Sequence, residues 1–341
     1  MEQILKEAAE TFIELIKDKS VKVISHYDCD GITSAAIMAK ILKKLDKKFS
    51  IKIVKNLEKD FVKNLKVKEE EIIIFLDLAS STLEEIGTLK TKVFVIDHHE
   101  ISSIPAENTI FVNPHSINEE EVSSSGLVYL FSKQINGKDK DLANLAVVGM
   151  VGDMLDRRIS KLNNLILKDA EIKIKRSILL YPATRPINKT LEFSSSLFIP
   201  GITGNSKGAA NMLREIGIKK QNDNYKSLIE LDEEELGKLI TAILLRTGKS
   251  GEDIIGNIYL INFFNKLEDA REISAMINAC SRLGYSNIAL SFCLGDKKTA
   301  RKTEDIYAKY KQQIISALNY VENNKIEGRR YIIINAKDNI K

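Results

Sequence analysis

The sequence predicts an α/β fold: a doubly wound, mostly parallel sheet, followed by a helical connector and a smaller α/β carboxyl-terminal domain. Short β-branched runs alternate with stretches of helical period along the amino-terminal part of the chain, as in successive βαβ units. Several of these runs are apolar throughout, which is typical of strands buried on both faces. A cluster of prolines and glycines within residues 182–204 then marks a junction between domains.

The elements of the sheet domain follow in order. An amphipathic helix opens the chain, because apolar residues recur every three or four positions. Gly31 supplies a tight turn after the first strand, and Thr33 or Ser34 is expected to cap the next helix. The predicted strands are residues 21–27, 50–55, 71–78, 91–98 and 109–113. The predicted helices are residues 2–18, 32–45, 124–135 and 141–156, with a helical pattern that continues to about residue 180.

The junction divides the chain into three segments. Beyond it, residues 206–248 have a helical pattern, and the remainder mixes helix with strand. The strands predicted in that part are residues 255–263, 287–294 and 330–335. We therefore expect a sheet domain at residues 1–185, a linker and helical connector at 186–250, and a small carboxyl-terminal domain at 251–341.

Composition excludes several classes of protein. No stretch approaches the roughly 18 uninterrupted apolar residues of a membrane-spanning helix, so no membrane partner is expected. Acidic residues interrupt the first apolar stripe, unlike the core of a signal peptide. Cys29, Cys280 and Cys293 lack paired spacing, which excludes a disulfide scaffold and a zinc knuckle and predicts a cytoplasmic protein. The net charge of +4 permits a nucleic-acid partner without arguing for one.

Polar side chains gather where three predicted strands end. They are His26, Asp28 and Asp30 after the first strand, Asp77 after the third, and Asp97, His98 and His99 after the fourth. The first three share one face if the backbone stays extended, and Cys29 then faces the core. Because ligands of open α/β sheets bind outside the carboxyl ends of the strands, these side chains mark the candidate site.

The clustered carboxylates and imidazoles point to a metal centre, because so much negative charge in one place is costly without a cation. The sequence holds no thiolate cluster, which argues against structural zinc. The donors exceed the needs of one ion, so we expect two divalent ions that share a carboxylate and activate water for attack on phosphorus. Imidazole ligands favour Mn²⁺ or a similar transition ion, whereas Mg²⁺ prefers oxygen. Hydrolysis of a phosphoester is the expected reaction.

Four motifs resemble those of the DHH phosphoesterase superfamily, and within it those of archaeal RecJ-like single-strand nucleases. They are His26-x-Asp28-x-Asp30-Gly31, Asp77 at the end of an apolar strand, Asp97-His98-His99, and Gly149-Met150-Val151-Gly152-Asp153. Supporting matches are Ser123–Gly126, Thr184–Pro186 and Asn278–Gly284. The residues alone do not choose between Asp153 and Asp156, whereas the resemblance selects Asp153.

The resemblance implies a role for each residue of the centre. The implied metal ligands are Asp28 and His26 for the first ion, Asp30, His98 and Asp153 for the second, and Asp77 as the bridge between them. His26 stands at a position that varies among relatives. His99 would face the scissile phosphate and stabilise or protonate the leaving oxygen, while Asp97 would orient a ligand. Gly149 and Gly152 would let their helix approach the metal edge closely.

Several other residues are candidates for contact with the substrate. They are Ser124, Ser125, His115, Arg185, Asn278 and Arg282. The two serines open a helix whose free amides would hold a phosphate, or they only cap that helix. His115 follows a strand and is either close to the site or structural. Arg185 precedes a proline, where it would meet a backbone phosphate, and Asn278 and Arg282 lie four apart on a predicted helix that would contact a nucleotide.

The implied function is a manganese-dependent exonuclease that acts on single-stranded DNA or RNA in DNA repair or replication. Relatives carry a Gly-Gly-His signature in a carboxyl-terminal domain that grips the strand, but no histidine follows His115 here. We therefore expect the chain to stop soon after such a domain would begin, and to benefit from a partner such as a DNA helicase or replisome component. Cleavage polarity stays open.

Two other classes of function remain open. A replisome or helicase-associated binding factor shares the fold, although such a scaffold would not need a complete set of ligands. A short-oligonucleotide or small-molecule phosphodiesterase would use the same centre. A family II inorganic pyrophosphatase is disfavoured, because its His-x-x-x-Asp-x-Asp spacing and its late Ser-Arg-Lys-Lys-Gln motif are both absent.

Overall fold

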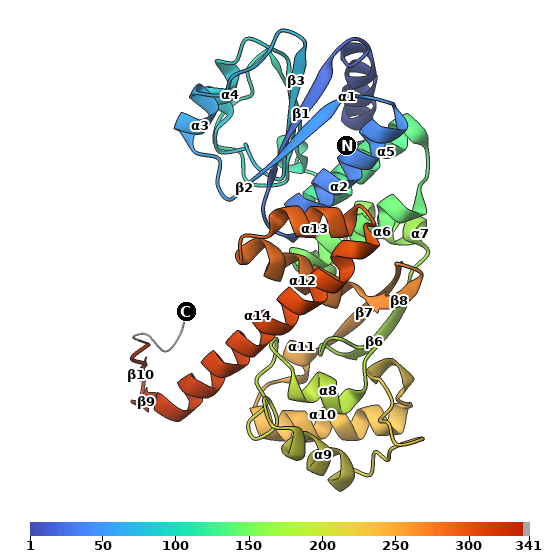
Figure 1. Cartoon of the computed structure of the whole chain (residues 1–341), viewed down its shortest axis with the longest axis vertical. Coiled ribbons are helices and arrows are strands. Elements are labelled where there is room, and N and C mark those ends of the chain that lie inside the picture. Colours follow the sequence, from blue (N-terminus) through green and yellow to red (C-terminus); the bar gives the residue numbers. More distant parts are fainter. Residues whose placement is uncertain (337–341) are drawn as a thin grey trace. The chain divides into compact units, whose positions relative to one another are not determined.

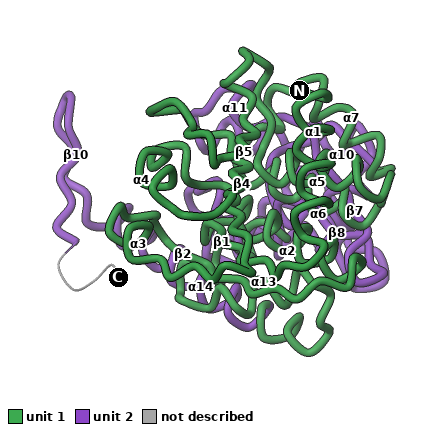
Figure 2. The backbone as a smooth tube through the Cα atoms, turned by 90° about the horizontal axis from the view of Figure 1, so that it is seen from above, with its two compact units in different colours: residues 1–172, 273–303 green, residues 173–272, 304–341 purple. Residues whose placement is uncertain are grey.

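The computed structural model describes residues 1–336 (Figure 1). The chain divides into two compact units, each built from two separate stretches of sequence (Figure 2). Unit 1 consists of Met1–Ile172 and Ile273–Thr303, and unit 2 consists of Lys173–Glu272 and the chain from Glu304 onward. Two helices, α12 (Ala270–Arg282) and α14 (Lys297–Asn324), each contribute residues to both units. The predicted division into three segments, with boundaries at residues 185 and 250, differs from these two units and stays a prediction.

A five-stranded parallel sheet forms the centre of unit 1, which confirms the predicted fold class. Its strands are β1 (Ser20–His26), β2 (Phe49–Val54), β3 (Glu71–Leu76), β4 (Val93–Ile96) and β5 (Thr109–Val112). Their spatial order is β2-β1-β3-β4-β5. Every residue of β3 and β4 is buried, as their uninterrupted apolar sequences predict.

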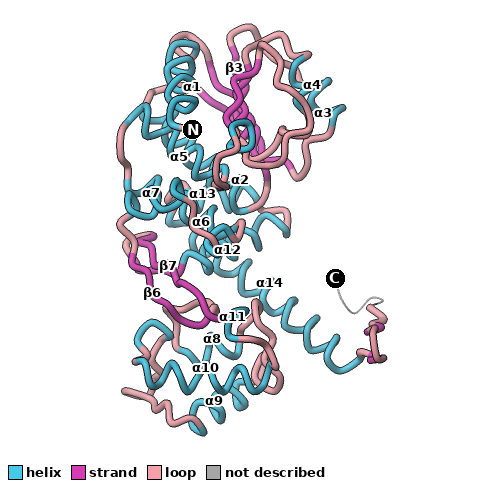
Figure 3. Tube along the Cα trace, turned by 180° about the vertical axis from the view of Figure 1, so that it is seen from behind, coloured by secondary structure: helices cyan, strands magenta, loops and turns pink. Residues whose placement is uncertain are grey.

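Helices cover both faces of this sheet (Figures 1 and 3). They include α1 (Glu2–Leu15), α2 (Cys29–Lys44), α3 (Lys59–Lys63), α4 (Leu83–Gly87) and α5 (Ser124–Asn136). On one face, Val62 of α3 and Leu83 and Ile86 of α4 pack against buried residues of β1, β3 and β4. On the other face α1, α2 and α5 contact the sheet, and Phe12 of α1 packs edge-on against Phe94 of β4 with ring centroids 5.4 Å apart. The sheet is therefore doubly wound.

The rest of unit 1 is helical. It contains the short 3₁₀ turns η1 (Pro114–Ile117) and η2 (Leu155–Arg157), and the helices α6 (Lys140–Gly152), α7 (Lys161–Ala170) and α13 (Ser286–Cys293), together with most of α12. α6 packs against α2, α5 and α7, and α13 packs against α2. The helix predicted at 141–156 thus ends earlier, at Gly152.

Unit 2 is built around a three-stranded antiparallel sheet with the order β6-β7-β8. Its strands are β6 (Lys173–Ile178), β7 (Ile255–Phe263) and β8 (Lys266–Asp269). Its short helices are α8 (Ile187–Glu192), α9 (Ser206–Glu215), η3 (Leu228–Glu230), α10 (Glu233–Thr247) and α11 (Gly251–Ile254). They enclose an apolar core with β6 and β7. After α14, the strands β9 (Ile326–Glu327) and β10 (Ile332–Ile333) form a small hairpin.

Several predicted elements were wrong. The strand predicted at 287–294 is helix α13, whose buried residues Ala289, Phe292 and Cys293 follow a helical spacing. The helical pattern predicted to about residue 180 ends at β6, whose residues Lys173–Ile178 pair with β7 instead. The stretch 206–248, predicted as helical, contains α9, the short 3₁₀ turn η3 and α10, with a loop between α9 and η3, and the proline-rich junction holds α8.

Among the helices of residues 1–336, none combines the length and apolar character that crossing a membrane requires.

Candidate metal centre

The register of the sheet brings the strand ends to one level. Leu76 of β3 pairs with Ile96 of β4, and Ile96 pairs with Val112 of β5. The amides of the next residues, Asp77 and Asp97, continue the ladder by donating to the carbonyls of Ile96 and Val112. The strand order reverses direction between β1 and β3, since β2 lies on one side of β1 and β3 on the other. A reversal of this kind is where open α/β sheets bind their ligands.

The turn after β1 differs from the predicted extended run. Asp28 is the N-cap of α2 and accepts a hydrogen bond from the amide of Gly31 at 3.0 Å. The helix therefore begins at Cys29, and Asp30 lies in its first turn rather than on an extended strand. The expectation that Thr33 or Ser34 would cap this helix was wrong, because both are buried within it. Cys29 is buried, as predicted.

The carboxylate of Asp30 is fully buried and held by the start of α5. Its two oxygens accept hydrogen bonds from the amides of Ser124 at 2.6 Å and Ser125 at 3.0 Å. These amides lie at the positive end of the α5 dipole, which favours a negative partner there. The site predicted for a phosphate on Ser124 and Ser125 is thus filled by a carboxylate of the chain itself.

Within residues 1–336, three groups of donor atoms lie close enough to hold a metal ion, and Asp77 belongs to all three. They are Asp77, His98 and His99; Asp30, Asp77, His98 and Asp153; and His26, Asp28 and Asp77. In the second group, Nε2 of His98 lies 3.1 Å from Oδ2 of Asp153, 3.5 Å from Oδ1 of Asp77 and 3.9 Å from Oδ2 of Asp30. In the third, Nδ1 of His26 lies 2.9 Å from Oδ2 of Asp28 and 3.3 Å from Oδ2 of Asp77.

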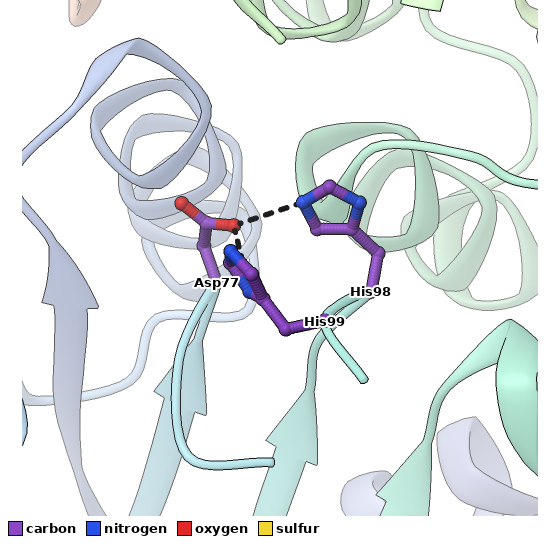
Figure 4. Close-up of side chains that lie close together, drawn as sticks. All are labelled: Asp77, His98 and His99. Atoms are coloured by element: carbon purple, nitrogen blue, oxygen red, sulfur yellow. Dashed lines mark ion pairs between the residues drawn. The ribbon is translucent and has the colours of Figure 1, made fainter. Parts of the chain in front are cut away.

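The two oxygens of Asp77 therefore face different partners. Oδ1 faces His98, and also Nδ1 of His99 at 3.9 Å (Figure 4), whereas Oδ2 faces His26. Asp77 adopts φ 60°, a left-handed conformation that is uncommon outside glycine and that often marks functional sites. This backbone places a single buried carboxylate between two sets of imidazole and carboxylate donors.

The residues fit a divalent cation. Within residues 1–336, Oδ1 of Asp77 is buried and accepts no hydrogen bond, which leaves a lone pair for a ligand. Burial raises the pKa of Asp77 to about 6, although His26 and His98 oppose this change. Burial and the charges of Asp153 and Asp77 also raise the pKa of Asp30 well above its ordinary value. A bound cation would relieve this repulsion between carboxylates.

The carboxylates of the site favour positive charge at His26 and His98. Burial alone would lower the pKa of His26, but hydrogen bonds to Asp28 and Asp77 outweigh burial and raise it to about 10. For His98 the hydrogen bond to Asp153 and the nearby charges of Asp30 and Asp77 likewise outweigh burial, and they raise the pKa to about 12. The pocket is thus electrostatically arranged for positive charge.

His99 is held by Asp97 beside this group. Nδ1 of His99 lies 2.7 Å from Oδ1 of Asp97, and its side chain is half exposed. Asp97 is fixed in turn, because it accepts hydrogen bonds from the amides of Ser80 at 2.9 Å and His98 at 2.8 Å. Burial opposes ionisation of Asp97, yet hydrogen bonds from His99 and Ser80 lower its pKa to about 2. With Nδ1 engaged, Nε2 is the ring nitrogen left to meet a substrate.

A cavity of about 520 Å³ opens next to these residues. Its walls include His26, Asp77 and His99 of the donor groups, with Asp97 beside them, and also Lys55, Asn56, Leu57, Ser80, Ser81 and Glu100. This volume lies within the usual range for small-molecule sites, roughly 300–1,000 Å³. A phosphoester has room to reach the donor groups.

The remaining predicted residues lie in other settings. His115 is exposed on η1 and belongs to none of the three donor groups. Arg185 lies in unit 2, where its guanidinium faces Glu268 at 3.5 Å and Glu272 at 3.7 Å. Arg282 is exposed on α12. Asn278 accepts a hydrogen bond from the amide of Cys29.

Two residues of the site, Asn113 and Ser80, were missed from the sequence. The side-chain amide of Asn113 donates to Oγ of Ser80 at 3.1 Å and to the carbonyl of His99 at 2.9 Å. It thereby ties the end of β5 to the loop after β3 and to the loop after β4 that carries His98 and His99. Asn113 directly follows a predicted strand, so the rule that selected Asp77 and Asp97 would have selected it as well.

Two family models match the chain. The DHH family, N-terminal domain, matches residues 20–150, and the DHH-CID domain matches residues 180–255. The uncharacterized protein MJ0831 of Methanocaldococcus jannaschii is 31% identical over 325 residues, which cover 91% of this chain and 72% of that protein. The single-stranded-DNA-specific exonuclease RecJ of Bacillus subtilis is 24% identical over 166 residues, which cover 44% of this chain but only 21% of that protein.

Solved structures share the fold. Exonuclease RecJ bound to manganese matches 94% of this chain and 67% of its own, with a TM-score of 0.52 and 18% identity. CDC45 from Entamoeba histolytica matches 94% of this chain and 73% of its own, with a TM-score of 0.66 and 14% identity. Together with the family models and the sequence relatives, these matches show that the chain belongs to the DHH family and is a RecJ-like member of the DHH superfamily.

Proposed function

We propose that this protein is a metal-dependent phosphodiesterase that removes nucleotides from an end of single-stranded DNA or RNA. The observation that carries the proposal is the position of Asp77, a buried carboxylate whose two oxygens face two separate sets of donors. A shared carboxylate between two ions is the arrangement of two-metal hydrolysis of phosphate esters. The names of two relatives support the substrate and the metal: the Bacillus protein is specific for single-stranded DNA, and a RecJ structure contains manganese.

The geometry supports one set of ligands for each ion. His26, Asp28 and Asp77 would hold one divalent ion, and Asp30, Asp77, His98 and Asp153 would hold the other. Imidazole nitrogens among the donors favour Mn²⁺ over Mg²⁺. When bound, the two cations would supply an activated water molecule and would neutralise charge on the scissile phosphate.

The protein's own groups orient the reaction. The amides of Ser124 and Ser125 fix Asp30, so that its carboxylate keeps its place among the donors. Asp97 fixes the imidazole of His99 through Nδ1 and points Nε2 away from itself. His99 thereby holds a proton for the oxygen that leaves phosphorus, a role that imidazoles commonly fill.

The experiment is hydrolysis of single-stranded DNA labelled at the 5′ or the 3′ end, with Mn²⁺, Mg²⁺ or EDTA. The expected result is a ladder of products that depends on metal and is lost in D77A. The matched control is D18A, because Asp18 is exposed on the loop after α1. The label released first gives the polarity. Absence of cleavage of DNA and RNA by protein that has bound manganese would exclude the nuclease.

A second candidate function is a binding factor for a DNA helicase or replisome. The observation in its favour is the fold that the chain shares with CDC45. Binding of single-stranded DNA with no metal-dependent cleavage would favour this function. Hydrolysis of bis(p-nitrophenyl) phosphate or dinucleotides, without activity on longer strands, would instead favour a small-substrate phosphodiesterase.

A further inference from the structure

Helix α12 reaches the start of α2 within unit 1. The two residues that meet there, Cys29 and Asn278, are 249 positions apart in the sequence. Oδ1 of Asn278 accepts a hydrogen bond from the backbone amide of Cys29 at 3.0 Å. The chain thus passes through the first stretch of unit 2 before it supplies this contact to unit 1.

The amide of Cys29 needs a partner from outside its helix. Cys29 is the first residue of α2, and amides in a first helical turn have no acceptor within the helix. Asp28 serves other donors of this turn, because its side chain accepts from Gly31 and its carbonyl accepts from Ile32. Asn278 therefore supplies an acceptor for the amide of Cys29 that the local sequence does not supply.

The side chain of Cys29 is fixed as well. It is 1% exposed, and Sγ lies 3.6 Å from the carbonyl of Val148 on α6. A Cβ at Gly152 would lie 2.8 Å from Cβ of Cys29 and 3.2 Å from Oγ of Ser274 on α12. Cys29 is therefore packed by residues of α6 and α12. The hydrogen bond to Asn278 fixes the backbone of Cys29 between these two helices.

We propose that Asn278 is a positioning residue that holds Asp28 and Asp30 in their metal-binding places through the amide of Cys29. Asp28 and Asp30 flank Cys29 and belong to different donor groups. A displacement of the backbone at residues 28–30 would move one ligand in each group. Binding of both ions therefore depends on the position of this turn. This role replaces the nucleotide contact expected for Asn278, and it rests on the metal centre of the proposed function.

The test is Mn²⁺ binding, followed by the electron paramagnetic resonance signal of free Mn²⁺, in wild type, N278A and N278D. N278A removes the acceptor, and we expect about 10- to 100-fold weaker binding at both sites, as for other residues that support metal ligands. N278D keeps an oxygen acceptor at the same place and is expected to bind at least as well as wild type. The matched control is N287A, since Asn287 is an exposed asparagine on α13.

Binding of Mn²⁺ by N278A with the affinity of wild type overturns the inference. In that case a higher KM for oligonucleotides would assign Asn278 to the substrate. If circular dichroism shows that N278A does not fold, N278Q takes its place: it keeps the amide but moves the acceptor by one methylene, and the same two outcomes decide. A wild-type protein that binds no Mn²⁺ overturns the proposed metal centre and this inference together, whereas equal binding by wild type and variant overturns this inference alone.

Discussion

Gly149 lies so close to Asp30 that any side chain at position 149 would overlap the Asp30 carboxylate. A Cβ there would also clash with Oγ of Ser125 and would lie 2.7 Å from Oγ1 of Thr33. The glycine therefore allows α6 to pack against α2 and α5 at the point where Asp30 is held. This is the close approach that the glycines of this helix were expected to permit.

The first prediction concerns G149A. The added methyl group must displace either α6 or the carboxylate of Asp30, so we expect a loss of about 1–3 kcal/mol in the free energy of unfolding. We also expect Mn²⁺ affinity to fall by about 10- to 100-fold, because Asp30 moves relative to the other donors. Denaturant unfolding and manganese titration measure the two effects.

The matched control for G149A is G237A. Gly237 is exposed within α10, and a Cβ there would have no atom within 4 Å. Alanine is the better helix former by about 1 kcal/mol, so G237A is expected to stabilise the protein and to leave metal binding unchanged. Wild-type metal affinity in G149A would show that the packing of α6 does not position Asp30.

The second prediction separates a bridging ligand from terminal ligands. Asp77 contacts both donor sets, whereas Asp28 and Asp153 each belong to one. D77N should therefore lose high-affinity binding of both ions, while D28N and D153N should each lose one. Counting bound Mn²⁺ per chain after gel filtration distinguishes these outcomes. Loss of a single ion in D77N would contradict the bridging role.

Much of this site could be predicted from sequence, and the reason is geometric. The carboxyl ends of parallel strands meet at one edge, so Asp77, Asp97 and the two histidines that follow could be placed together from strand assignments alone. The conformation of Asp30 could not, because it depends on the cap formed by Asp28 and on the amides at the start of α5.

Contacts between distant segments could not be predicted from the sequence for a different reason. A hydrogen bond between Asn278 and Cys29 spans 249 positions, and no local pattern encodes it. The strand expected at 287–294 shows a related limit. Short apolar runs suit both a buried strand and a half-buried helix, and only packing of α13 on α2 decides between them.

The third prediction concerns pH and unit 2. Burial raises the pKa of Asp269 from 3.8 to about 6, although it accepts hydrogen bonds from the amides of Arg271 and Ala183. A raised carboxyl pKa means that the folded state binds the proton more tightly than the unfolded state. As the pH rises from about 4 to 6, the proton is lost from folded Asp269. The free energy of unfolding should therefore fall by on the order of 3 kcal/mol over this range.

The test compares D269N with wild type. Asparagine does not titrate, so the difference in free energy of unfolding, D269N minus wild type, should rise between pH 4 and about 6 and stay constant above. Denaturant unfolding at half-unit intervals measures it. Asparagine also loses a hydrogen bond, but this loss is the same at every pH. It shifts the whole curve of the difference against pH and leaves its shape unchanged. Parallel curves for the two proteins would contradict the prediction.

The last prediction tests the proton that His99 is proposed to hold. The sugar oxygen that leaves a DNA strand needs a proton, whereas p-nitrophenolate leaves without one. H99A should therefore lose about 10²–10⁴-fold in kcat on single-stranded DNA, the usual contribution of a positioned acid, but far less on bis(p-nitrophenyl) phosphate. D97N should show the same pattern more weakly, because Asp97 orients His99 through the 2.7 Å contact at Nδ1. Unchanged Mn²⁺ binding in both variants is part of the expected result. An equal loss on both substrates would mean that His99 binds the phosphate without donating a proton to it.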